Sequence, residues 1–342
     1  MKVSACIIQS ITPEEPLRNS DKKSLMKHLE SSFNGKNNFW RYIVLMLLIF
    51  AATNTIGSLP LTIVSLVKSS GNQQTLSEIS SDINFLTTVG ISQNVILSLV
   101  LFAFVVGLVT YFLMVKPMHE RTFLQTITGA TKFRWSRAYI SGAVWIILMA
   151  AYLFIYLGVD PENFSINNSS LSLIVLAIIA IALIPFQAAF EEVIFRGYLM
   201  QGFTLLVPNR LFPLISTSVL FALMHSLNPE VKEYGFFAVM PQYLTFGLIF
   251  GIITILDDGI EAALGAHAAN NIFLCIMVTQ ESSALQTQAL YQQHNYHPWI
   301  ELAGLVVSGI ILILILKRIF RWESFSVLIT SVKPSRTDIQ IP

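Results

Sequence analysis

The sequence predicts an all-α bundle of about eight transmembrane helices, with both termini in the cytosol. Composition is the first support for this fold class: 54% of the 342 residues are hydrophobic, only 12% are charged, and the mean hydropathy is +0.64. Soluble globular proteins carry about 25% charged residues. The composition therefore excludes a soluble globular chain. The formal net charge of +1 gives no reason to expect nucleic acid as a partner.

The second support is a series of long apolar runs. A helix needs about 20 mostly apolar residues to cross the hydrocarbon core of a membrane. Eight candidate segments occur along the chain: 41–66, 92–115, 139–158, 171–190, 211–226, 236–256, 260–279 and 299–316. Two of them differ from the rest, because 211–226 is short and 260–279 carries one Glu, one His and two Asn. Either could instead be a helix buried inside the bundle.

The third support is the distribution of basic residues, which favours eight crossings. If the N-terminus is cytosolic and all eight segments cross, all but Lys68 and Lys232 of the 21 Lys and Arg residues lie on the cytosolic side. This is the bias expected of an inserted protein. Removing one doubtful segment would place the basic tail with Lys317, Arg318 and Arg321 outside. The sequence therefore predicts an integral multi-pass protein of the plasma membrane.

Ionisable residues cluster where the run 171–190 ends, in the sequence Glu191-Glu192-Val-Ile-Phe-Arg196. Charged groups within a membrane are costly, so they are functional candidates by default. Glu192 and Arg196 are i,i+4 neighbours and can pair, whereas Glu191 is rotated by about 100° and faces elsewhere. A carboxylate left unpaired within its helix can act as a general base toward water. The alternative is that the two acids only mark the membrane surface.

Two further polar clusters lie in apolar segments. His225 shares a helix face with Phe221, and His267 shares one with Asn271, so that the latter two could offer two hydrogen-bond donors to one oxygen. Each alone could also be a satisfied core histidine or an interhelical hydrogen bond. Together with Glu191 they form the minimum set for hydrolysing an amide, since they can activate water and stabilise an oxyanion.

The three clusters resemble the signatures of a known family. Glu-Glu-x-x-x-Arg, Phe-x-x-x-His and His-x-x-x-Asn occur here in order, on hydrophobic segments, and the first motif continues as Phe-Arg-Gly. They are similar to the motifs of the CAAX protease and bacteriocin-processing family, also called the Abi family. Its members are membrane-embedded glutamate endopeptidases related to the type II CAAX prenyl endopeptidase. The resemblance covers about 171–280.

The resemblance implies a role for each motif residue. Glu191 would be the base that activates water, and His225 would help to position that water. His267 and Asn271 would form the oxyanion site. Glu192 and Arg196 would brace the helix through an ion pair. With Glu191 as the base, no metal or other cofactor is expected.

The apolar runs and the resemblance over 171–280 together divide the chain into four regions. Residues 1–40 are expected to be a polar cytosolic tail, and 41–170 to hold the N-terminal transmembrane helices. Residues 171–280 form the catalytic core, and 281–342 the last transmembrane helix and a cytosolic tail. Within the second region, basic and apolar residues alternate over 116–137, which suits either an amphipathic helix on the cytosolic face or a solvated loop.

The expected function is hydrolysis of a peptide bond in a membrane-associated or lipid-modified protein or peptide, with membrane lipids as the other partner and no nucleic acid. A zinc protease is one alternative, with Glu191, His225 and His267 as ligands, although the usual His-Glu-x-x-His spacing is missing. A non-catalytic immunity or scaffold protein is another. The acidic turn 257–261 departs from the family pattern and would favour basic substrate residues, or simply be solvated.

Overall fold

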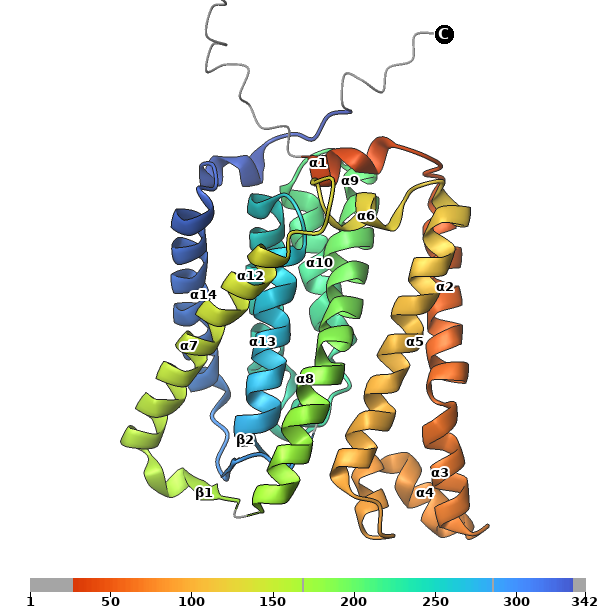
Figure 1. The fold of residues 1–342 in the computed structure, drawn as a ribbon, viewed down its shortest axis with the longest axis vertical. Coiled ribbons are helices and arrows are strands. Elements are labelled where there is room, and N and C mark those ends of the chain that lie inside the picture. Colours follow the sequence, from red (N-terminus) through yellow and green to blue (C-terminus); the bar gives the residue numbers. More distant parts are fainter. Residues whose placement is uncertain (1–26, 168, 285, 335–342) are drawn as a thin grey trace, which may run out of the picture.

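The computed structural model describes residues 27–334 apart from 168 and 285, and it confirms the all-α bundle. Residues 1–26 and 335–342 of the two predicted tails lie outside the described residues. Figure 1 shows long helices standing side by side, with short elements gathered at both ends of the bundle. The long apolar helices are α2 (Phe39–Ala52), α5 (Gln93–His119), α7 (Trp135–Val159), α8 (Ser170–Glu192), α12 (Phe236–Asp257) and α14 (Pro298–Phe320).

Shorter helices extend or connect these. Two π-helical segments, η2 (Thr53–Gly57) and η5 (Val193–Leu199), continue α2 into α3 (Leu59–Ser69) and α8 into α9 (Met200–Leu206). The remaining helices are α1 (Lys27–Glu30), η1 (Ser31–Phe33), α4 (Gln73–Ser81), η3 (Ile83–Thr87), α6 (Phe123–Ile127), η4 (Pro161–Asn163), α10 (Leu211–Met224), α11 (Pro229–Tyr234), α13 (Glu261–Met277) and η6 (Phe325–Ile329).

Each of the eight predicted apolar segments forms a helix. Six helical stretches are long and apolar enough to cross a membrane: Phe39–Ser69, Gln93–His119, Trp135–Val159, Ser170–Leu206, Phe236–Asp257 and Pro298–Phe320. The other two segments are α10 and α13, with 14 and 17 residues. These are the same two segments whose sequences differ from the other six. The chain is an integral membrane protein.

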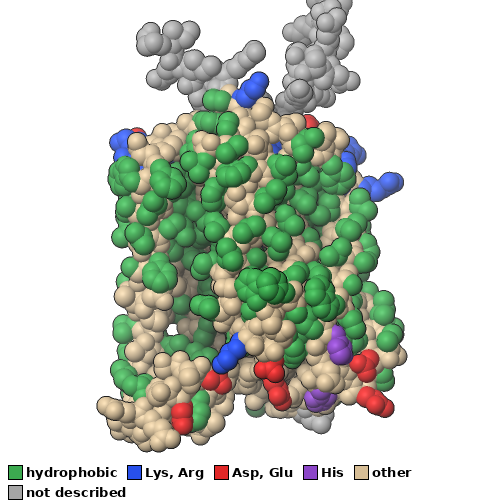
Figure 2. Space-filling model, turned by 180° about the vertical axis from the view of Figure 1, so that it is seen from behind, with side chains coloured by type: hydrophobic (Ala, Val, Ile, Leu, Met, Phe, Trp, Pro, Cys, Tyr) green, Lys and Arg blue, Asp and Glu red, His purple; other side chains and the backbone are tan. Residues whose placement is uncertain are grey.

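Both described ends of the chain lie at the same end of the bundle. Leu29 and Val332 belong to one buried apolar cluster, together with Met200 of α9 and Leu214 of α10. Lys and Arg side chains gather at this end on the face shown in Figure 2, and a broad hydrophobic band lies below them. An even number of passes explains this arrangement. That this end faces the cytosol is a prediction from the positive-inside rule.

Thiol labelling in whole cells tests this orientation. In a protein without Cys6 and Cys275, we expect Ser81→Cys and Glu281→Cys to react with an impermeant maleimide, because both exposed positions lie at the end opposite the described termini. Ser326→Cys, which is exposed at the terminal end, should react only after the cells are permeabilised. Labelling of Ser326→Cys in intact cells would contradict the orientation.

The segment 116–137 does not form one continuous helix. Helix α5 continues to His119, and only the five-residue α6 follows before α7 begins. A capping box between Thr122 and Gln125 starts α6, and Ile127 is buried in an apolar cluster. Phe123 and Leu124 are half-buried and pack against the same cluster.

A small sheet closes the opposite end of the bundle. It consists of β1 (Phe164–Ile166), β2 (Val278–Thr279) and β3 (Tyr291–Gln293), in the order β1-β3-β2. Strand β3 pairs antiparallel with β1, Phe164 opposite Gln293, and parallel with β2, Val278 opposite Tyr291. The sheet ties the connection between α7 and α8 to the end of α13.

Helices α7 and α13 approach until their backbones touch. A Cβ atom on Gly265 would lie 2.0 Å from the carbonyl oxygen of Ala138, and one on Gly142 would lie 2.9 Å from the carbonyl oxygen of Gly265. Small residues allow such close approach in membrane bundles. The contact fixes α13 against α7 two residues before His267.

Candidate active site

The first motif lies where α8 changes its winding. The helix passes through Glu191 and Glu192 and then continues as the π-helical η5, which contains Arg196. Pro185 lies inside α8 without ending it. π-Helical segments occur frequently at functional sites, since the wider turn moves side chains out of the regular α-helical register. Both glutamates are buried.

The predicted pair between Glu192 and Arg196 is present. Arg196 Nη1 donates to Glu192 Oε1 at 2.8 Å, and both side chains are fully buried. The guanidinium also lies 4.4 Å from the ring centre of Phe221, the first residue of the second motif. Its Nη2 donates to the carbonyl oxygen of Gly247 on α12 at 3.3 Å. The pair thus connects α8 and η5 with α10 and α12.

His267 on α13 contacts both glutamates. Its Nδ1 donates to Glu192 Oε1 at 2.7 Å, and its Nε2 lies 3.5 Å from Glu191 Oε2. The ring stacks on Phe250, with the ring centres 5.0 Å apart. Because Nδ1 donates to a carboxylate, Nε2 carries a hydrogen only when the imidazole is protonated. His267 therefore links the buried ion pair to Glu191.

Amide side chains hold Glu191 from the other side. Gln187 Nε2 donates to Glu191 Oε1 at 2.5 Å, and Asn271 Nδ2 donates to Gln187 Oε1 at 2.9 Å. Asn270 and Trp145 extend this network, because Trp145 Nε1 donates to Asn270 Oδ1 and Asn270 donates to Asn271. Glu191 thus has a partner within its own helix, contrary to the expectation. Sequence reasoning missed Gln187, although a polar residue four positions before Glu191 in an uncharged run was a signal.

His225 ends α10. Its Nδ1 donates to the carbonyl oxygen of Phe221 at 2.7 Å. The ring lies against Tyr243, with ring centres 4.3 Å apart, and against Phe221, at 4.6 Å. In a neutral imidazole held this way, Nε2 is an acceptor. His225 can therefore accept a hydrogen bond from a water molecule or a substrate.

One cavity of about 510 Å³ joins the candidate catalytic residues. Glu191, His225, His267 and Asn271 all line it, whereas Glu192 and Arg196 do not. The cavity extends to the sheet end of the bundle, where further residues line it: Val278, Thr279, Gln280, Gln293, Tyr296 and Glu301. Of the described residues that line it, none belongs to the loops at the end where α1 and η6 lie.

The set suggested for zinc is not arranged as a metal site. Within residues 27–334, the described chain holds no group of three or more His, Cys, Asp or Glu side chains placed to bind a metal ion. Glu191, His225 and His267 share a cavity, but the ring of His225 is directed by Phe221 and Tyr243, and that of His267 by Glu192. Both rings are thus oriented by residues of the chain itself.

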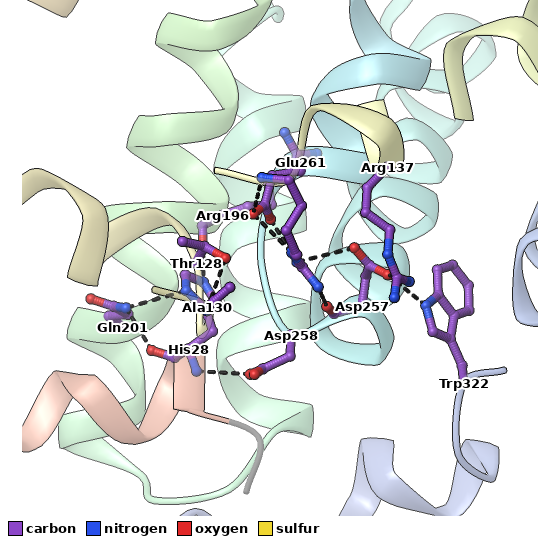
Figure 3. Close-up of polar contacts among 11 residues, drawn as sticks. His28, Thr128, Ala130, Arg137, Arg196, Gln201, Asp257, Asp258, Glu261 and Trp322 are labelled. Carbon is purple, nitrogen blue, oxygen red and sulfur yellow. Dashed lines mark hydrogen bonds and ion pairs between the residues drawn. The ribbon is translucent and has the colours of Figure 1, made fainter. Parts of the chain in front are cut away.

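The acids of the turn 257–261 bind residues of the chain itself (Figure 3). Arg134 donates to both carboxylate oxygens of Glu261, at 2.9 and 2.6 Å. Arg137 pairs with Asp257, and Trp322 Nε1 donates to Asp257 Oδ1 at 2.7 Å. Asp257 and Glu261 are buried, so they are neither solvated nor open to a substrate. Both expectations for this turn are wrong for these two residues.

The third acid of the turn holds the start of the described chain. Asp258 Oδ1 accepts from the backbone nitrogen of His28 at 2.8 Å (Figure 3). Burial lowers the pKa of His28 to about 4, so its ring is neutral at pH 7. His28 Nε2 donates to the carbonyl oxygen of Arg196 at 3.1 Å, and Gln201 donates to the carbonyl oxygen of His28 at 2.6 Å. The segment therefore packs directly on η5.

Comparison with known proteins places the site in a family segment. Residues 169–273 match the family described as type II CAAX prenyl endopeptidase Rce1-like. The resemblance seen in the motifs is thereby confirmed over this segment. The chain is also 36% identical over 172 residues to a protein of Bacillus subtilis (strain 168) named "Uncharacterized protein YyaK"; the matched region is 50% of this chain and 57% of that protein. No solved structure matches.

Proposed function

We propose, from the match of residues 169–273 to the type II CAAX prenyl endopeptidases, that this protein is a membrane-embedded endopeptidase of the plasma membrane. Its substrate would be a membrane-associated or lipid-modified protein or peptide. The observation that carries the proposal is the convergence of four polar side chains from α8, α10 and α13 on one cavity in an apolar bundle. Such groups are costly in a membrane, so their presence there favours a functional role.

In the proposed reaction, Glu191 acts as the general base without a metal. Its carboxylate takes a proton from water while the water oxygen attacks the carbonyl carbon of the scissile peptide bond. The C–N bond then breaks, and the proton passes from Glu191 to the leaving amine, which leaves a carboxylic acid and an amine as products. His225 positions the water, and Gln187 holds one oxygen of Glu191 so that the other can face the water.

The oxyanion would be stabilised by Asn271 and His267. Asn271 gives one amide hydrogen to Gln187 and has a second one free to donate. His267 gives its Nδ1 hydrogen to Glu192, so it donates from Nε2 in its protonated form. Nε2 lies 3.5 Å from Glu191 Oε2. Donors of this kind act mainly on the transition state.

Quantitative comparison of the membrane proteome tests this function. We expect at least one membrane-associated protein or peptide to be cut in a wild-type strain and to accumulate uncut in a Glu191→Ala strain, because loss of the base stops hydrolysis. The strain is rescued by the wild-type protein and, as a control, by Glu162→Ala, which alters an exposed acid. Two outcomes together would favour the non-catalytic immunity or scaffold protein instead. The proteomes of the two strains would be identical, and the Glu191→Ala strain would keep the cellular phenotype of the wild-type strain.

A further inference from the structure

The sheet end of the catalytic cavity carries two more carboxylates. Glu230 of α11 and Glu301, in the first turn of α14, both line the cavity that contains Glu191. The described lining includes three Glu and two His but no Lys or Arg. A cavity with this lining in a low-dielectric bundle attracts positive charge. Neither carboxylate has a role in the proposed hydrolysis.

Glu230 is buried and only partly hydrogen-bonded. It is 8% exposed, and its Oε1 accepts from the hydroxyl of Tyr243 and from Asn228 Nδ2, the latter at 3.2 Å. Its Oε2 is buried and has no hydrogen-bond partner in the described chain. A buried carboxylate oxygen without a partner is unfavourable by itself. Tyr243 also stacks on His225, so Glu230 lies one side chain away from the candidate catalytic histidine.

Glu301 is held by neutral donors. Its Oε2 accepts from the hydroxyl of Tyr152 at 3.0 Å, and its Oε1 accepts from Gln293 Nε2 at 3.4 Å. Among the described residues, neither Glu301 nor Glu230 has a Lys, Arg or His nitrogen within ion-pair distance. Other acids in the bundle, such as Glu192 and Glu261, do have cationic partners.

We propose that Glu230 and Glu301 form a subsite for a basic side chain of the substrate, within the same cavity as Glu191. Three tyrosines that line the cavity, at positions 152, 243 and 296, add aromatic faces that also bind cations. A Lys or Arg side chain entering here would supply the positive charge that the chain lacks. This inference rests on the proposed function and narrows its substrates to peptides with a basic residue near the scissile bond.

Peptide cleavage and peptide binding test the subsite separately. The probes are quenched-fluorescent peptides with an N-terminal palmitoyl chain and a neutral sequence. Each peptide carries one Lys, Gln or Glu, and this residue is moved through the sequence one position at a time. The wild-type protein in liposomes reports kcat/KM, and the Glu191→Gln protein reports Kd without cleavage. When the varied residue is at the position that reaches the subsite, we expect the Lys peptide to be cleaved and bound at least about tenfold better than the Gln peptide. Charge-assisted hydrogen bonds in a buried site have this strength.

The acidic variants then assign the preference to the subsite. The ratio between the Lys and Gln peptides should fall toward one in the double variant Glu230→Gln/Glu301→Gln and stay unchanged in Glu162→Gln, an exposed acid in the connection between α7 and α8. The ratio in the unaltered protein needs no variant, so misfolding of the double variant does not prevent the test.

The outcomes separate the two proposals. Cleavage without any preference for Lys, or a preference that persists in a folded double variant, would overturn the subsite and leave the endopeptidase standing. A preference in binding with no cleavage of any peptide would retain the subsite and count against the endopeptidase. Equal binding of the Lys, Gln and Glu peptides would overturn the subsite whether or not cleavage occurs.

Discussion

Glu191→Gln should lower kcat of the purified protein by at least about 10²-fold, because an amide of nearly the same shape cannot accept a proton from water. The substitution keeps an oxygen that accepts from Gln187, so the site should remain assembled and thermal stability should change little. Turnover of a substrate found by the proteome comparison is the measurement. Glu323→Gln, which alters an exposed acid after α14, is the matched control and should retain full activity.

The same assay separates the glutamate mechanism from the zinc alternative. Protein treated with a strong chelator should keep its activity if Glu191 activates water directly. Zinc bound in stoichiometric amount and lost together with activity in His225→Ala and His267→Ala would reject that mechanism but retain the peptidase. Full turnover by Glu191→Gln would reject Glu191 as the general base but retain the peptidase.

Glu192→Ala should lower the free energy of unfolding by about 3–5 kcal/mol, since it leaves the fully buried guanidinium of Arg196 without a carboxylate. It also removes the acceptor that orients His267, so activity should fall as well. Thermal unfolding in detergent measures the effect. Glu162→Ala, an exposed position, should stay within about 0.5 kcal/mol of the wild-type protein.

A double variant tests whether the loss comes from an uncompensated charge. Glu192→Ala/Arg196→Met removes both members of the pair, and we expect it to be more stable than Glu192→Ala alone, because buried ion pairs are often replaceable by apolar residues. Unchanged stability in Glu192→Ala would mean that the pair does not brace the helix.

The parts of this structure that depend on local pattern were predictable from the sequence. Each of the eight apolar runs contains a helix, because length and hydropathy are properties of a single segment. The i,i+4 spacing predicted the pair of Glu192 and Arg196 for the same reason. The clustering of Glu191, His225, His267 and Asn271 was expected from their chemistry and their resemblance to family motifs, and the structure places them around one cavity.

What depends on contacts between distant segments was not predictable. Strand β2 has two residues and β3 has three, too few to show a period in the sequence. Glu230 and Glu301 are separated by about seventy positions and meet in one cavity only through the packing of α11, α12 and α14. Asp257 and Glu261 looked free because their arginine partners lie more than a hundred residues earlier.

The close contact of α7 and α13 limits how this sequence can diverge. At position 265 even a methyl group would collide with the backbone at Ala138, and no rotamer can relieve a clash that starts at Cβ. A larger residue there is tolerable only if α13 tilts away, and the tilt would move the ring of His267 off its two carboxylates. Homologous chains with a bulkier residue at this position should therefore have lost the histidine, or the reaction, even though the altered site carries no polar group.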